Sequence, residues 1–303
     1  MRRVVAKPNR MRQLSAVQAV APDTNYPEPI APTAEVATRS AIQDFRDACA
    51  EQFQYRDLLL QLATRDLLLR YKQTAIGIAW ALFVPLLNTL IFSLLFMRVA
   101  PIRTTVPYPL FAYIGLVAWN LTAAALRSAT TSLTSNPTLV SKVYFPREVF
   151  PFAALLVSLV DAVVACVILV GMMLLYHIVP GPYALLVPAV LAVQLVFTAA
   201  LGLLLAMGNL FYRDVKYLFD AVLTIWMLAS SVVYPVGIVG GRLGQIMSWN
   251  PMAVIIDAYR ALVFQGTLPP GAPLAAIGIG SLLLLVVTWV MFHRAEYVFA
   301  ERI

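Results

Sequence analysis

The chain has 303 residues, of which 61% are hydrophobic and 12% are charged, about half the charged share of an ordinary soluble domain. This composition excludes a soluble globular protein and predicts an all-α integral membrane protein. The formal net charge of +7 is not gathered into a basic stripe with interleaved aromatic residues, so we expect no nucleic-acid partner. Membrane topology accounts better for the lysines and arginines.

The first segment, residues 1–45, mixes prolines, alanines and scattered charges without periodicity. That composition is typical of a disordered basic tail. The early arginines are not followed by the apolar segment of about 7–15 residues that a signal peptide requires. We therefore expect the tail to remain uncleaved in the cytoplasm.

Residues 46–74 are predicted to form an amphipathic helical region that lies in the membrane interface. At 100° per residue, Tyr71 and two leucines face away from a charged side made of Arg65, Asp66, Arg70 and Lys72. Thr64 is a candidate helix cap. Two interpretations remain open: a simple positive-inside anchor, or a collar that holds the membrane domain against a cytosolic partner.

The third segment, residues 75–303, is expected to be a six-helix transmembrane domain. A spanning helix needs about 20 apolar residues. Stretches of that length lie at 75–97, 108–133, 150–176, 183–210, 218–239 and 274–292. Six spans place both termini on the same side of the membrane.

The basic residues indicate on which side of the membrane the termini lie, because cytoplasmic flanks are enriched in lysine and arginine. The flanks that share a side with the termini carry ten such residues: Arg56, Arg65, Arg70, Lys72, Lys142, Arg147, Arg213, Lys216, Arg294 and Arg302. The opposite flanks carry four: Arg98, Arg103, Arg242 and Arg260. We therefore expect a multi-pass protein of the cytoplasmic (inner) membrane with both termini in the cytoplasm.

The connection at 135–151, on the inner side, is too long for a simple turn. A short helix is expected to begin after Asn136 and to end before Pro146. Phe145 then offers an apolar knob among the charged residues Lys142, Arg147 and Glu148. Such a segment suits docking into a cleft on another protein, but an ordinary loop between spans remains equally possible.

Polar residues inside spans need partners. Arg127 and Asp161 lie at similar depths, so we expect an ion pair between them, with a direct role in a substrate path as the alternative. Gln194 and Asn88 are expected to form hydrogen bonds between helices.

Catalytic and metal sites are not expected. His177 and His293 lie at span ends, where histidine is usually interfacial, and we predict no metal there. The phosphate-binding pattern GxxxxGK[ST] does not occur, so this chain is not expected to hydrolyse a nucleotide or to act as an enzyme.

Aromatic side chains within the spans are candidates for lining a pathway, because an aromatic face stacks on the C–H face of a sugar. Packing within the membrane is the alternative for each of them. The candidates are Trp80, Phe83, Trp119, Trp226 and Tyr234.

Four segments together carry a resemblance to a known family. They are RDLLLRYKQTAIGIAWALFVPLL at 65–87, SNPTLVSKVYFPREVFP at 135–151, NLFYRDVKYLFD at 209–220 and WNPMAVIIDAYRALVFQG at 249–266. In this order the chain resembles the membrane-spanning permease subunits of ABC exporters that move polysaccharides such as lipid-linked O-antigen, capsule or teichoic acid.

The resemblance implies a homodimeric channel with two copies of a separate cytosolic ABC ATPase, which would bind the ATP and magnesium. It implies a lipid-linked polysaccharide as substrate and short re-entrant outer helices within 242–266, with Trp249, Asn250, Tyr259 and Arg260 as an outer gate. It also implies that a coupling helix enters the ATPase, formed by Leu139, Val140, Lys142, Val143, Tyr144, Phe145 and Arg147.

Three alternatives remain at this stage. Relatives of similar topology export drugs or lipids. A membrane enzyme acting on polyprenyl-linked sugars would need clustered loop acids, whereas Glu148, Asp214 and Asp257 are scattered. An ion-coupled secondary transporter would be expected to show internal repeats or several charges near the midplane.

Overall fold

Helices account for every regular element that the computed structural model describes, namely residues 41–302 except 73–76, 78, 143 and 144. The predicted all-α class is therefore confirmed. Most of the expected N-terminal tail, residues 1–40, lies outside the described residues. Helix α2 (Ala41–Gln54) begins a few residues inside the segment that the sequence assigned to the tail.

Five helical segments are long and apolar enough to cross a membrane. The 25-residue α5, for example, is about 37 Å long, which exceeds a hydrocarbon core of about 30 Å. The spanning segments are built from α4 (Ala79–Leu94) with η1 (Leu95–Val99), α5 (Tyr108–Ser132), α7 (Val149–Leu175), η2 (Pro182–Leu186) with α8 (Val187–Phe211), and α12 (Gly271–Arg302).

The remaining predicted span, at 218–239, is broken. Helix α9 (Val215–Leu228) has 14 residues and is about 21 Å long, too short to cross the core alone. After it, Ser231 takes a φ of 36° and a short turn of helix, η3 (Val236–Ile238), follows. The six-span count is thus not confirmed.

Short helices follow α9, as the resemblance implied for the segment before the last span. They are α10 (Gly241–Ser248), α11 (Pro251–Arg260) and the π-helical η4 (Ala261–Gln265). Asn250 caps α11, because its Oδ1 accepts a hydrogen bond from the backbone N–H of Met252 at 3.1 Å.

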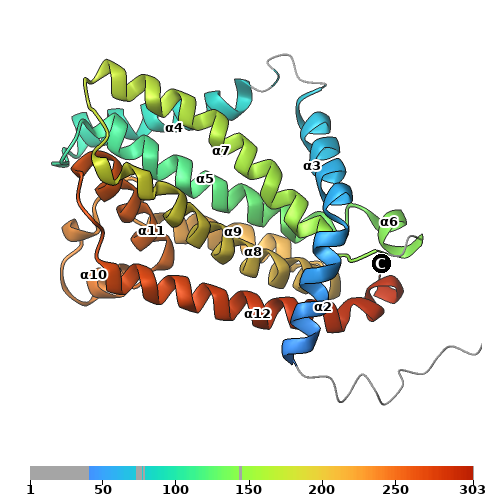
Figure 1. The fold of residues 1–303 in the computed structure, drawn as a ribbon. Coiled ribbons are helices and arrows are strands. Elements are labelled where there is room, and N and C mark those ends of the chain that lie inside the picture. Colours follow the sequence, from blue (N-terminus) through green and yellow to red (C-terminus); the bar gives the residue numbers. More distant parts are fainter. Residues whose placement is uncertain (1–40, 73–76, 78, 143–144, 303) are drawn as a thin grey trace, which may run out of the picture. The chain divides into compact units, whose positions relative to one another are not determined.

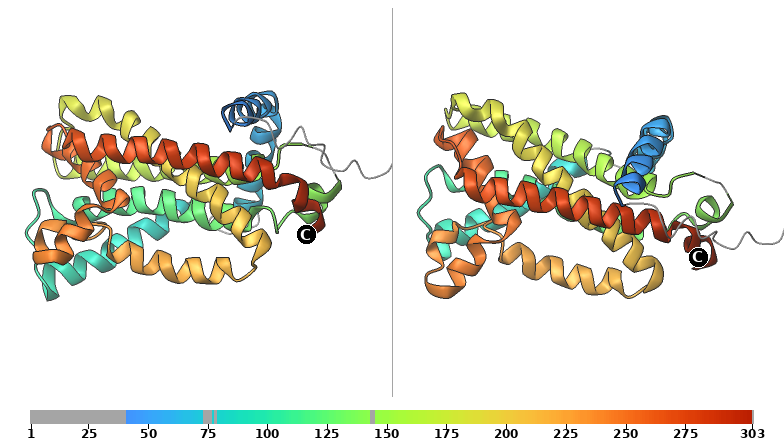
Figure 2. Two further views of the ribbon diagram at one scale, coloured as in Figure 1. Left: turned by 90° about the horizontal axis from the view of Figure 1, so that it is seen from below. Right: turned by 60° about the horizontal axis from the view of Figure 1, so that its bottom comes forward.

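Figures 1 and 2 show α5, α7, α8 and α12 running side by side, with α10 and α11 at one end of the bundle. Helix α6 (Pro137–Lys142) and the C-terminal turns of α12 lie at the other end. Following the topology expected from the sequence, we call these the outer end and the inner end. At the inner end α3 (Arg56–Tyr71) runs across the direction of the long helices, as an interface helix would.

The buried side chains form two main apolar cores. The outer core includes Tyr113, Trp119 and Ile255, whereas the inner core includes Leu62 of α3 and Val140 of α6. Because α3 and α6 both contribute to the inner core, packing fixes their positions on the bundle.

Candidate coupling site at the inner end

Helix α3 divides its side chains between two environments. Leu62 and Ala63 are buried, whereas Leu68 and Leu69 are 57% and 67% exposed. An apolar face turned away from the protein is what a helix in the membrane interface presents. Thr64 lies inside the helix and donates to the Leu60 carbonyl at 2.7 Å, so it does not cap the start as predicted.

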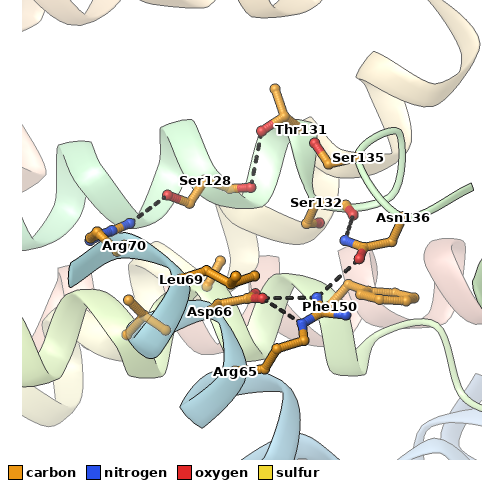
Figure 3. Close-up of a pocket in the computed structure, with 12 residues that line it drawn as sticks. Arg65, Asp66, Leu69, Arg70, Ser128, Thr131, Ser132, Ser135, Asn136 and Phe150 are labelled. Carbon is orange, nitrogen blue, oxygen red and sulfur yellow. Dashed lines mark hydrogen bonds and ion pairs between the residues drawn. The ribbon is translucent and has the colours of Figure 1, made fainter. Parts of the chain in front are cut away.

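A cavity of about 560 Å³ is lined by residues of α3, α5 and α7. Figure 3 shows the Arg65 guanidinium at its edge between two acceptors. Its Nη2 donates to the Asn136 Oδ1 at 3.0 Å and lies 2.8 Å from the Asp66 Oδ1. Asn136 in turn donates to the Ser132 carbonyl at the end of α5. Since Asn136 directly precedes α6, this chain of contacts joins the interface helix to the inner loop.

A second link joins α3 to α7 through Asp161. The Arg70 Nη1 lies 2.5 Å from one carboxylate oxygen, and the Tyr71 hydroxyl donates to the other at 2.6 Å. Burial, followed by the hydrogen bond to Asp161, raises the pKa of Tyr71 to about 12. The phenol therefore stays protonated and acts as the donor at neutral pH.

The predicted pair of Arg127 and Asp161 is wrong. Both residues line one cavity of about 240 Å³, but Arg127 pairs instead with Asp220 of α9 at 2.9 Å. The prediction rested on the depths of Arg127 and Asp161 along their two spans. In the structure, the partner of Asp161 is Arg70, which lies on α3 and outside both spans.

The inner loop does not present Phe145 as an exposed knob, which corrects the prediction. Its ring is 6% exposed and packs 5.5 Å from the ring of Phe150. Val140 is fully buried in the same inner core, and Leu139 is half-buried against it. These three predicted coupling residues therefore hold the loop onto the bundle.

The exposed face of α6 consists of other residues, namely Pro137, Thr138 and Ser141. Of the remaining predicted coupling residues, Val143 and Tyr144 lie outside the described residues, and the side chain of Lys142 is not described either.

Arg147 and Glu148 also turn inward, so the predicted charged rim around Phe145 is wrong. The Arg147 backbone N–H donates to the Glu296 Oε1 at 2.9 Å, and its guanidinium donates to the carbonyls of Val140 and Glu296. Glu148 is 1% exposed, and its Oε1 lies 3.1 Å from the His293 Nδ1. The end of the loop is thereby joined to α12.

Sequence reasoning missed Glu296 in this set. A signal was available, since Glu296 follows His293 by three residues and therefore shares its helix face.

The predicted channel-lining aromatics fall into two groups. Trp80 and Phe83 are 42% and 46% exposed on α4 and pack edge to face. Trp119, at 4% exposed, packs against Trp226 inside the outer core and lines no surface in this conformation. Tyr234 is half-buried and its hydroxyl donates to the Leu228 carbonyl.

Two of the predicted outer-gate residues, Asn250 and Arg260, bond to the end of α9 and to the residues just after it. Trp249 is 82% exposed, while Asn250 accepts from the Trp226 Nε1 at 3.0 Å. The Tyr259 hydroxyl donates to the Gln194 Oε1 at 2.8 Å, and Gln194 donates to the α5 backbone, which confirms Gln194 as a link between helices. Asn88 is half-buried on α4.

Arg260 is 3% exposed and is held by backbone carbonyls. Its guanidinium lies 3.6 Å from the Phe111 ring centroid. Nη1 donates to the Ser231 carbonyl and to the Asp257 carboxylate, and Nη2 donates to the carbonyls of Phe111 and Val232. Arg260 thus donates hydrogen bonds to the backbone carbonyls that follow the end of α9, which is a structural role at the outer end.

These features define a multi-pass helical membrane protein whose inner loop helix is tied to an interface helix on one side and to the last span on the other. A model of the ABC-2 type transporter family matches residues 57–264, more than half of the chain. The chain therefore belongs to the ABC-2 type transporter family. It is a membrane subunit of an ABC transporter rather than an enzyme, and membership implies association with an ABC ATPase.

Relatives match nearly end to end. An O-antigen export system permease protein RfbA of Myxococcus xanthus is 30% identical over 256 residues, which cover 84% of this chain and 98% of the relative. A protein of the same name from Klebsiella pneumoniae is 26% identical over 247 residues, which cover 81% of this chain and 94% of the relative.

Proposed function

We propose that this chain forms the channel of an ATP-driven exporter that moves a lipid-linked, O-antigen-like polysaccharide across the inner membrane. The observation that carries the proposal is the near-complete match to relatives named O-antigen export permeases. Two copies of the chain associate with two ATPase chains, which bind the ATP and magnesium, and both termini lie in the cytoplasm.

In this mechanism, closure of the ATPases pushes on the exposed face of α6, including Thr138 and Ser141. The buried side of α6 transmits the movement, because Val140 packs in the inner core and Asn136 hydrogen-bonds to Arg65 of α3. The two halves of the channel then shift and open a path, to which Trp80 and Phe83 contribute aromatic faces for sugar rings. The outer helices α10 and α11 act as its gate.

Co-purification of the chain with its candidate ATPase tests the assignment of α6. Ser141→Trp places a bulky ring on the exposed face of α6, and we expect it to reduce ATPase recovery strongly. Ser248→Trp is the matched control, because Ser248 is also an exposed helical serine whose hydroxyl donates to its own helix, but it lies at the outer end on α10. If wild type recovers no ATPase at one copy per permease, the motor assignment fails; if Ser141→Trp recovers as much as Ser248→Trp, α6 is not the docking element.

Transport measured in vesicles containing the complex tests the substrate. A defined lipid-linked glycan should cross only with ATP, and a phospholipid or drug of similar size should not compete. Transport of the drug or lipid instead of the glycan would refute the polysaccharide assignment while leaving the ABC mechanism intact. Ion-driven transport without ATP would refute both.

A further inference from the structure

Three side chains from two segments meet at the inner end of the bundle. Glu148 directly precedes α7, and His293 and Glu296 lie on one face of α12. One ligand atom from each lies within 4.8 Å of the others. The His293 Nδ1 is 3.1 Å from the Glu148 Oε1 and 3.9 Å from the Glu296 Oε2.

One oxygen of this cluster has no hydrogen-bond partner. Glu148 is only 1% exposed, and its Oε2 is buried without a hydrogen-bond partner among the described residues. A buried carboxylate oxygen left unpaired is costly, so it calls for a positively charged or hydrogen-bonding ligand.

The second carboxylate is held in a fixed orientation. The Glu296 Oε1 accepts from the Arg147 backbone N–H at 2.9 Å, and the Arg147 guanidinium donates to the Glu296 backbone carbonyl. With Oε1 occupied in this way, Oε2 is the oxygen nearer to His293. Support of a ligand carboxylate by a neighbouring donor is a regular feature of metal sites in proteins.

We propose that Glu148, His293 and Glu296 bind one divalent transition-metal ion, with Zn²⁺ as the best fit. Zinc takes imidazole nitrogen and carboxylate oxygen ligands at about 2.0–2.2 Å, so its ligand atoms lie roughly 3 Å apart. The separations of 3.1 and 3.9 Å between the His293 Nδ1 and the two carboxylates therefore need only small side-chain adjustments. The ion also offsets the charge of two carboxylates, and bidentate coordination by Glu148 would give its Oε2 a partner as well.

Such an ion would join the end of the inner loop to the last helix, between residues 145 positions apart in sequence. It would hold the loop that follows α6 against α12 without depending on the exported substrate. The competing arrangement is a metal-free ion pair between a protonated His293 and Glu148.

The test uses the full-length chain purified in detergent, with its affinity tag removed and bound metal stripped by a chelator. Titration with Co²⁺ should produce visible d–d absorption that saturates at one ion per chain, and Zn²⁺ should displace the Co²⁺. The chain has two histidines, which provides a matched pair of variants. His293→Asn should lose the bound ion, whereas His177→Asn should keep it.

Glu148→Gln keeps the shape of the side chain and should also lose the ion, and it serves as the test variant if His293→Asn does not fold. The proposal is overturned if wild type binds neither Co²⁺ nor Zn²⁺, which leaves the metal-free ion pair. It is equally overturned if His293→Asn and Glu148→Gln bind one ion as wild type does, or if a thiolate charge-transfer band shows that a cysteine, Cys49 or Cys166, supplies a ligand. Failure of export with intact metal binding would refute the proposed substrate and not the site.

Discussion

Replacing Arg260 with methionine tests whether the outer end is organised by one buried guanidinium. The variant keeps a long apolar side chain but removes every donor from a site that is 3% exposed. The carbonyls of Phe111, Ser231 and Val232 would each lose a hydrogen bond, at donor–acceptor distances of 3.2, 2.7 and 2.8 Å in the native structure.

The size of the effect follows from those acceptors. A buried acceptor left unpaired costs about 1–3 kcal/mol. If relaxation restores one of the three, the two acceptors that remain unpaired cost about 2–6 kcal/mol. For a chain of this size about 2–4 °C accompanies each kcal/mol, so we expect a fall in melting temperature of about 10 °C.

Thermal unfolding of the detergent-purified chain, followed by the loss of the size-exclusion peak, measures this shift. Arg242→Met is the matched control, because Arg242 is exposed on α10 in the same outer segment. Arg260→Lys should fall between the two, since one ammonium cannot reproduce the guanidinium fork. If Arg260→Met melts together with Arg242→Met, the guanidinium does not hold the end of α9.

Three further predictions concern packing and pairing. Gly115→Ala would place a Cβ 2.3 Å from the Val232 carbonyl oxygen, so its melting temperature should fall by several degrees, whereas Gly171→Ala, with no neighbour within 4 Å, should leave it unchanged. Phe145→Ala should cost about 3–5 kcal/mol of stability because the ring is buried; an unchanged melting curve with weaker ATPase binding would restore the knob interpretation. A double-mutant cycle should give a coupling of up to about 1 kcal/mol between Arg70 and Asp161 and none between Arg127 and Asp161, and the reverse result would refute the observed pairing.

The spanning helices were predictable because a helix that crosses the membrane needs a continuous run of about 20 apolar residues, which can be read directly from the sequence. The stretch expected at 108–133 is helix Tyr108–Ser132, and the one expected at 150–176 is helix Val149–Leu175. The stretch at 218–239 is not confirmed as a single spanning helix, because an apolar run does not reveal that α9 ends at Leu228 and that Ser231, just beyond it, adopts a positive φ. Backbone breaks of this kind depend on tertiary partners, here the Arg260 donors at the Ser231 and Val232 carbonyls.

The site was less predictable because its contacts join residues far apart in sequence. Periodicity placed Arg65 on a charged face of α3, but it carried no information that the face meets Asn136, 71 residues away. The neighbouring charges predicted an exposed Phe145. In the structure, Arg147 and Glu148 instead bond to residues of α12, and the Phe145 ring is buried in the inner core. Local sequence therefore identified the inner loop as unusual without showing which of its side chains face the protein.

The arrangement of those side chains bears on how movement passes through the inner end. Arg65 holds the residue before α6, the Arg147 guanidinium reaches back to the Val140 carbonyl, and Glu148 meets His293 of the last helix. Close-packed interiors transmit displacement because they compress little. In the proposed mechanism, a push on the exposed face of α6 would be delivered through these contacts to the interface helix and to α12 together. This requires the buried side of α6 to be apolar, and Leu139 and Val140 on that side do pack in the inner core.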